Sequence, residues 1–157
     1  MNHLIQFVDL ADNSLSQDSL YLVLEGAKKN PNLVSLNISQ NELGAGPLSS
    51  AFNSLLGMFE PGSLTPETIK SQNLEELILS NNHLTNKHIE QLAGQIKVCP
   101  LSSLRKLDIS LNTIGVKGIL SFFQALRANL QMKISHLNLD RCNLEMGSTQ
   151  EQVNNFY

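Results

Sequence analysis

The segment Leu104–Ile114, which reads LRKLDISLNTI, decides the fold. Its residues follow the spacing L-x-x-L-x-L-x-x-N-x-L, with isoleucine in place of two of the leucines. Successive side chains of a β-strand point to opposite faces of the sheet. The spacing therefore predicts a short strand whose apolar side chains face a core, while Lys106, Asp108 and Ser110 point outward.

The same pattern occurs five times along the chain. Its polar position, which we call the ladder position, holds Asn13, Asn41, Asn82, Asn112 and Cys142, separated by 28, 41, 30 and 30 residues. A side-chain amide at the turn after each strand satisfies backbone groups that no neighbouring strand reaches, so we expect the ladder residues to be buried. The corresponding strands are predicted near residues 5–10, 33–38, 74–79, 104–109 and 134–139.

The second half of each unit repeats as well. In the first four units, apolar residues recur seven, ten, eleven and fourteen positions after the ladder residue, which is one face of an α-helix. This spacing predicts helices over residues 17–29, 45–56, 86–98 and 116–129. A single unit of strand, turn and helix cannot bury its own apolar face, so the units must stack with their strands in parallel.

These motifs resemble leucine-rich repeats, and helix-containing units of 28 to 30 residues are similar to the ribonuclease-inhibitor-like class. The resemblance extends from Ile5 to about Leu144. It implies an α/β leucine-rich repeat solenoid, a curved right-handed β-α superhelix with a parallel concave sheet and outer helices. We therefore expect residues 1–157 to form a single leucine-rich repeat domain of about five repeats.

Two segments depart from the repeat. Residues 57–72 make the second unit about a dozen residues longer than the others, and Thr65-Pro66-Glu67 within them is typical of a helix start. Such an insertion either contributes to a binding face or is tolerated padding. After the fifth ladder residue the helical spacing degenerates, which predicts partial disorder in the tail, residues 147–157.

Composition limits the functions open to the chain. Its 157 residues include 28 leucines and 17 each of asparagine and serine, a composition typical of a repeat protein. Eleven basic and fourteen acidic residues give a formal charge of −3, which disfavours nucleic acid as a partner. No apolar run approaches the roughly 20 residues of a membrane span, and no classical signal peptide is visible. Two cysteines without paired spacing favour a reducing compartment.

No catalytic motif is present. The chain contains no nucleotide-binding glycine loop, no His-Glu-x-x-His and no G-x-S-x-G sequence. His83 and His88 do not share a helix face, so we expect both at the surface, and neither cysteine has the setting of a nucleophile. The sequence predicts a protein that is not an enzyme, with no catalytic residues, no metal site and no cofactor.

The outward strand residues form three rows across the predicted sheet. Row one is Phe7, Ser35, Glu76, Lys106 and His136; row two is Asp9, Asn37, Ile78, Asp108 and Asn138; row three is Ala11, Ser39, Ser80, Ser110 and Asp140. Phe7 and Ile78 are the apolar anchors of this surface, and binding energy concentrates in such anchors. We predict that a protein partner contacts Phe7, Asp9, Asn37, Glu76, Ile78, Lys106, Asp108, His136 and Asn138.

The resemblance implies a non-catalytic protein–protein interaction module that binds a protein partner on the concave sheet. Its class includes effectors that bacterial pathogens secrete, so one interpretation is a secreted effector acting on a host protein. The alternative is a structural or adaptor segment of a larger protein such as a ubiquitin ligase or a cytoskeletal regulator. We expect a cytoplasmic location, or secretion by a non-classical route into a host cell, and a monomer or weak self-association through the open sheet edges.

Overall fold

The computed structural model describes residues 4–46, 49–59, 73–99 and 103–143. One layer is a five-stranded sheet in which every pair is parallel and the strands follow chain order. Each strand is three residues long, shorter than the predicted six-residue ranges: β1 (Phe7–Asp9), β2 (Ser35–Asn37), β3 (Glu76–Ile78), β4 (Lys106–Asp108) and β5 (His136–Asn138).

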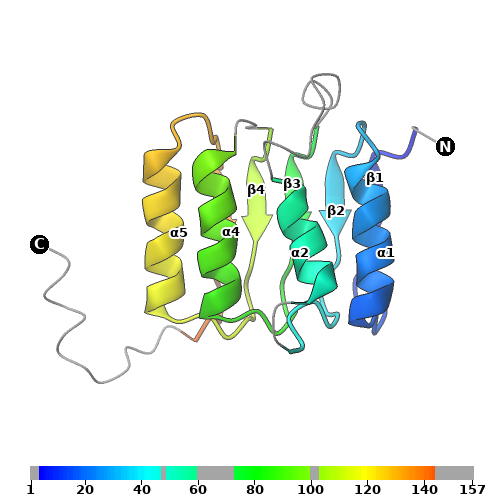
Figure 1. Ribbon diagram of the computed structural model, residues 1–157, viewed down its shortest axis with the longest axis horizontal. Helices are drawn as coiled ribbons and strands as arrows, with labels where there is room; N and C mark the ends of the chain where they lie inside the picture. Colours follow the sequence, from blue (N-terminus) through cyan, green and yellow to red (C-terminus); the bar gives the residue numbers. More distant parts are fainter. Residues whose placement is uncertain (1–3, 47–48, 60–72, 100–102, 144–157) are drawn as a thin grey trace, which may run out of the picture.

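The second layer consists of helices that stand side by side over one face of the sheet (Figure 1). They are α1 (Gln17–Lys28), α2 (Ser50–Gly57), α4 (Asn86–Val98) and α5 (Val116–Ala128). The described ends of the chain lie at opposite ends of this array (Figure 1). This arrangement confirms the predicted α/β solenoid with a parallel sheet and outer helices.

The start of α2 differs from the prediction of a helix over residues 45–56. Gly46 has a φ of 120°, which is not helical, and Ser49 is the N-cap, its hydroxyl accepting a hydrogen bond from the Phe52 N–H at 3.1 Å. A serine oxygen in this position satisfies one of the N–H groups that a helix start leaves unpaired. The helix therefore begins at Ser50, five residues later than the apolar spacing indicated.

The core lies between the sheet and the helix layer, and its side chains are least exposed to solvent in the middle units. Leu36, Leu77 and Leu107, which point inward from β2, β3 and β4, are at most 1 % exposed. The equivalent residues of the outer strands, Val8 and Leu137, are only partly buried. Each inward side chain is thus covered by the units on both sides of it, as expected for a stacked repeat.

The ladder asparagines join each unit to the one before it. The side-chain oxygen Oδ1 of Asn112 accepts hydrogen bonds from the backbone N–H groups of Asn82 and Leu84, both at 2.9 Å. Its amide nitrogen donates to the carbonyl oxygens of Leu79 and Ile109, each at 3.0 Å. A single buried side chain therefore satisfies donors and acceptors in two consecutive turns.

Asn41 and Asn82 bind the preceding turn in the same way, and Cys142 keeps part of the pattern with its thiol 3.3 Å from the Ile109 carbonyl oxygen. The expectation of burial is wrong for Asn13, which is exposed and donates only to the nearby Ala11 carbonyl oxygen at 2.9 Å. The physical reason is its place in the stack, because no described unit precedes the first one.

Helix α5 depends on the preceding unit for its cap. Its N-cap is Gly115, which has no side chain to offer. The Asn86 carboxamide oxygen instead accepts from the N–H groups of Gly115 at 2.9 Å and Gly118 at 3.0 Å. A Cβ atom at position 118 would lie 2.7 Å from that oxygen, so the close approach requires glycine there.

The predicted insertion over residues 57–72 begins inside the core. Gly57 closes α2, and Met58 and Phe59 are each 6 % exposed. Residues 57–59 therefore belong to the packed second unit, although the repeat spacing had assigned them to the insertion. The remainder of the predicted insertion and the tail, residues 147–157, lie outside the described residues.

We predict that Asn112→Ala lowers the free energy of unfolding by roughly 3 kcal/mol, because it leaves the buried N–H groups of Asn82 and Leu84 without acceptors. Urea denaturation followed by circular dichroism measures this change. The matched control is Asn13→Ala, which removes one exposed hydrogen bond and should cost less than about 1 kcal/mol. Equal losses in the two variants would contradict the structural role given to the buried ladder residues.

Candidate functional site

The face of the sheet opposite the helices, which we call the open face, is not covered by any element of the described residues. The strand register places the members of row one directly beside one another, from Phe7 through Ser35, Glu76 and Lys106 to His136. Row two is aligned in the same register: Asp9, Asn37, Ile78, Asp108 and Asn138. All nine predicted partner-binding residues therefore lie on one surface.

Row three departs from the predicted outward surface at two positions, Ser39 and Ser110, whereas Asp140 is exposed as the alternation predicted. Ser39 and Ser110 are 6 % and 5 % exposed, so these two members are buried. The chain turns after row two, and each of these hydroxyls donates back to the row-two side chain two residues earlier: Ser39 to Asn37 at 2.8 Å and Ser110 to Asp108 at 2.6 Å. Ser39 and Ser110 thereby hold the row-two side chains Asn37 and Asp108 in place.

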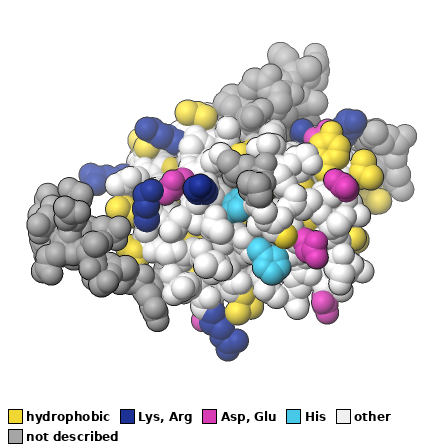
Figure 2. Space-filling model, turned by 60° about the horizontal axis from the view of Figure 1, so that its bottom comes forward, with side chains coloured by type: hydrophobic (Ala, Val, Ile, Leu, Met, Phe, Trp, Pro, Cys, Tyr) yellow, Lys and Arg dark blue, Asp and Glu magenta, His cyan; other side chains and the backbone are white. Residues whose placement is uncertain are grey.

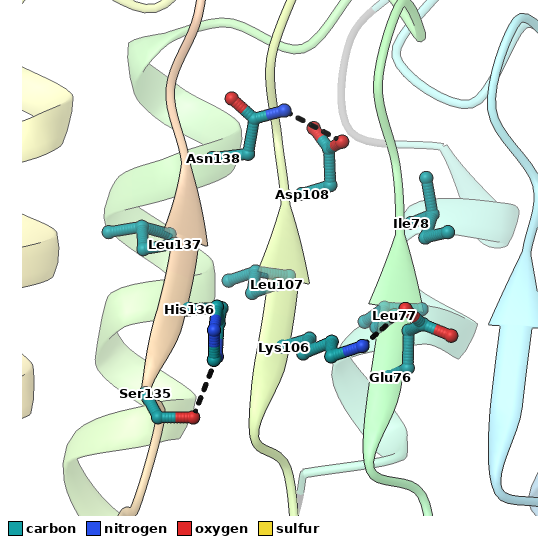
Figure 3. Close-up of a pocket in the computed structure, with 10 residues that line it drawn as sticks. All are labelled: Glu76, Leu77, Ile78, Lys106, Leu107, Asp108, Ser135, His136, Leu137 and Asn138. Carbon is teal, nitrogen blue, oxygen red and sulfur yellow. Dashed lines mark hydrogen bonds and ion pairs between the residues drawn. The ribbon is translucent and has the colours of Figure 1, made fainter.

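Row one carries two separate sets of polar contacts. The Ser35 hydroxyl donates to one carboxylate oxygen of Glu76 at 2.8 Å. The Lys106 ammonium lies 3.6 Å from the other oxygen (Figure 3). At the far end, the Ser135 hydroxyl is hydrogen-bonded to Nδ1 of His136 at 3.0 Å. The Lys106 side chain is 57 % exposed although it is paired with Glu76.

Row two is held in place around one apolar residue. The Asp108 carboxylate accepts from the Ser110 N–H at 2.9 Å and from the Asn138 amide at 3.0 Å. Asn37, on the other side of Ile78, accepts from the Ser39 N–H at 3.1 Å. Ile78 thus lies half-buried between two side chains whose rotamers are fixed by hydrogen bonds.

A hollow of about 490 Å³ opens over strands β3, β4 and β5. Six of the nine predicted residues line it: Glu76, Ile78, Lys106, Asp108, His136 and Asn138 (Figure 3). Phe7, Asp9 and Asn37 lie outside it, toward β1. Sequence reasoning missed Ser135, which lines the hollow through its contact with His136, because it precedes the strand and belongs to none of the three rows.

Charge is distributed unevenly along the stack. Residues 4–43 carry five acidic and two basic side chains, whereas residues 103–143 carry two acidic and six basic ones. Figure 2 shows the same trend on the face it presents, with most Asp and Glu side chains toward the α1 end and most Lys and Arg side chains toward the α5 end. Although the net charge of the chain is only −3, the α1 end of the stack is acidic and the α5 end is basic.

Two family models match the chain, both described as leucine-rich repeats. One matches residues 29–46 and 101–123, and the other matches residues 73–94. The three matched segments contain strands β2, β3 and β4. The chain is a leucine-rich repeat protein. A comparison with curated proteins finds no match.

Leucine-rich repeat proteins generally act as non-catalytic binding scaffolds. Among the described residues, no three His, Cys, Asp or Glu side chains are grouped so that they could hold a metal ion. Burial raises the pKa of the Cys142 thiol above its ordinary value of 9.0, which keeps this sulfur protonated rather than nucleophilic. None of the described helices has the length and apolar character needed to cross a membrane.

The expectation that His88 lies at the surface of this leucine-rich repeat protein is wrong. The residue is 3 % exposed, and its ring packs edge-on against Phe52 with the ring centroids 4.6 Å apart. Its Nδ1 atom accepts a hydrogen bond from the N–H of Thr85, the N-cap of α4, at 3.1 Å. His88 therefore takes the part that Glu or Gln plays in a capping box, a signal that its spacing from Thr85 could have given.

Burial lowers the pKa of the His88 imidazole below its ordinary value of 6.5. The unfolded chain therefore takes up this proton at a higher pH than the folded chain does. The stability that neutral His88 contributes is complete above its ordinary pKa and is lost as the pH falls below about 6.5.

We predict that His88→Gln reduces the loss of stability between about pH 7.5 and pH 5, because Gln still accepts the Thr85 N–H but does not titrate. Denaturant midpoints measured across this pH range test the prediction. His83→Gln, at an exposed position, is the matched control and should retain the wild-type pH dependence. An unchanged pH dependence in His88→Gln would exclude His88 as the group responsible.

Proposed function

We propose that this leucine-rich repeat protein is a non-catalytic interaction module that binds a protein partner on its open face. The observation that carries the proposal is the hollow over β3, β4 and β5, where Ile78 lies among polar side chains that are already hydrogen-bonded to one another. An apolar anchor surrounded by oriented polar groups is the usual composition of a protein-binding surface.

The order of these side chains favours binding. A side chain immobilised on binding costs about 0.5–1.5 kcal/mol in lost conformational freedom. Glu76, Asp108 and Asn138 are already held by hydrogen bonds and ion pairs, so little of this cost remains for them. In this proposal the exposed side chains of Lys106 and His136 contribute specificity through charge and hydrogen bonding to the partner.

The size of the surface points to a compact contact. Five strands spaced by about 4.8 Å span about 20 Å, which is wide enough for a helix, a loop or one face of a small domain. In this proposal the partner places an apolar side chain against Ile78 and polar groups against Lys106 and His136. Phe7, Asp9 and Asn37 extend the contact toward β1.

Two biological settings fit such a module. In the first, it is a secreted bacterial effector that reaches a host cell by a non-classical route and holds a host protein. In the second, it is a cytoplasmic adaptor segment of a larger protein such as a ubiquitin ligase or a cytoskeletal regulator. The length of the reading frame distinguishes the two.

We predict that Ile78→Asp reduces partner capture at least tenfold, because it places a charge in the centre of the contact that must be desolvated. Immobilised protein is incubated with bacterial and mammalian lysates, and the retained proteins are quantified by mass spectrometry. Val98→Asp is the matched control, since Val98 is 58 % exposed at the end of α4 in the helix layer.

The proposal requires that a protein be retained by the wild type and by Val98→Asp but lost by Ile78→Asp. Circular dichroism and denaturant midpoints establish that each variant is folded before capture is compared. Equal retention by all three proteins would move the binding site away from the open face. Loss in Val98→Asp alone would assign the site to the helix layer.

A further inference from the structure

The row-two position has a structural role that recurs along the stack. In four of the five units it holds Asp or Asn, and the side-chain oxygen Oδ1 accepts a hydrogen bond from the N–H group two residues later. The bonds are 2.9–3.1 Å long and run from Ala11 to Asp9, Ser39 to Asn37, Ser110 to Asp108 and Asp140 to Asn138. Asp and Asn side chains commonly stabilise turns in this way. The turn after each of these strands is therefore held by its row-two residue.

Ile78 departs from this pattern. It lies between Asn37 and Asp108 in the strand register, and an isoleucine side chain has no atom that accepts a hydrogen bond. It belongs to the open face and is only half-buried, whereas the preceding residue, Leu77, points to the core and is fully buried. Neither the turn nor the core accounts for an isoleucine here. Its exposed apolar surface is therefore available for a contact outside the chain.

The charge of Asp108 also exceeds what its turn needs. Asn37 accepts hydrogen bonds from the N–H and the hydroxyl of Ser39 at 3.1 and 2.8 Å. Asp108 accepts from the same two groups of Ser110 at 2.9 and 2.6 Å. A neutral amide thus makes after β2 the same two bonds that a carboxylate makes after β4. The turn therefore does not require the negative charge.

This charge is held in place but is not neutralised. Ser110 binds Oδ1 of Asp108, and the Asn138 amide binds Oδ2 at 3.0 Å, so all three donors are uncharged. Among the described residues, no basic side chain forms an ion pair with Asp108, and Figure 3 shows Lys106 extending toward Glu76 instead. A partner that covers this half-buried carboxylate removes water from it. That step is unfavourable unless the partner supplies an opposite charge.

The other polar side chains of the hollow do not reverse this preference. The Lys106 ammonium and the Glu76 carboxylate are paired with each other, so their charges largely cancel. His136 is hydrogen-bonded through Nδ1 to the Ser135 hydroxyl. With His136 neutral, the residues that line the hollow carry one net negative charge, which lies on Asp108.

We propose that the hollow binds a segment of a protein partner that carries a cationic side chain, Lys or Arg, beside an apolar one. The apolar side chain packs on Ile78, and the cation pairs with Asp108. These two residues are direct neighbours on β3 and β4, and neighbouring strands lie about 4.8 Å apart, so the two partner side chains must also be close together. This inference rests on the proposed function, to which it adds the chemistry of the partner.

The probe for this inference is a displayed library of random peptides, selected on the immobilised wild-type chain. Enriched peptides are synthesised with a fluorescent label, and anisotropy gives their Kd for the wild type, Ile78→Asn and Asp108→Asn. Asparagine already occupies row two in β2 and β5, so both variants are compatible with the turn. The controls make the same substitutions in the helix layer: Asp18→Asn in α1 and Val98→Asn in α4. Circular dichroism establishes that every variant is folded.

We expect the enriched peptides to carry Lys or Arg beside an apolar residue. Their Kd should rise about tenfold in Ile78→Asn and in Asp108→Asn, and should not change in the two controls. Equal weakening by Asp108→Asn and Asp18→Asn would reduce the effect to general attraction by the net charge, and would overturn the pairing with Asp108.

The remaining outcomes separate this inference from the proposed function. Peptides that depend on Ile78 but not on Asp108 would overturn the cationic chemistry and leave the open face as the binding site. Peptides that bind all variants equally would overturn both proposals. A selection that enriches no peptide would overturn this inference, while the lysate capture decides the proposed function separately.

Discussion

The structure depends on one requirement, that the backbone groups in each turn after a strand find hydrogen-bond partners away from water. The parallel sheet satisfies the strands themselves, but the turns lie beyond its edge. The ladder amides fill this gap because a carboxamide is both donor and acceptor and reaches into the preceding turn. Asn82 and Asn112 do this from positions that are 0 % and 4 % exposed. Turns that are satisfied in this way allow neighbouring units to stack closely enough for Leu36, Leu77 and Leu107 to be buried.

The open face results directly from this stacking. Burying every second strand residue leaves the others in aligned rows, so side chains far apart in sequence become neighbours, as Glu76 and Lys106 do. The turn after row two then buries Ser39 and Ser110, whose hydroxyls hold Asn37 and Asp108 in place. The scaffold therefore decides where the outward side chains lie and which of them are held in place by hydrogen bonds.

Periodicity predicted the features that repeat, and it was weakest where a residue acts outside the repeat. The parallel strands, the helix layer and rows one and two follow from spacing alone, because a solenoid places equivalent residues side by side. The burial of His88 did not follow, since it depends on a cap at Thr85 and on contact with Phe52 of another unit. The late start of α2 and the exposure of Asn13 likewise reflect local turn geometry and position in the stack.

The cap that Asn86 provides for α5 limits how far the units are modular. A repeat protein invites the view that its units are interchangeable and can be deleted, duplicated or shuffled. Here the start of α5 is capped by Asn86, which belongs to the unit before it. Gly118 leaves the space that the Asn86 side chain needs. Removing the third unit would therefore damage the fourth without altering any of its residues. The repeats have similar structures, but the helix of the fourth unit has its cap only when the third unit precedes it.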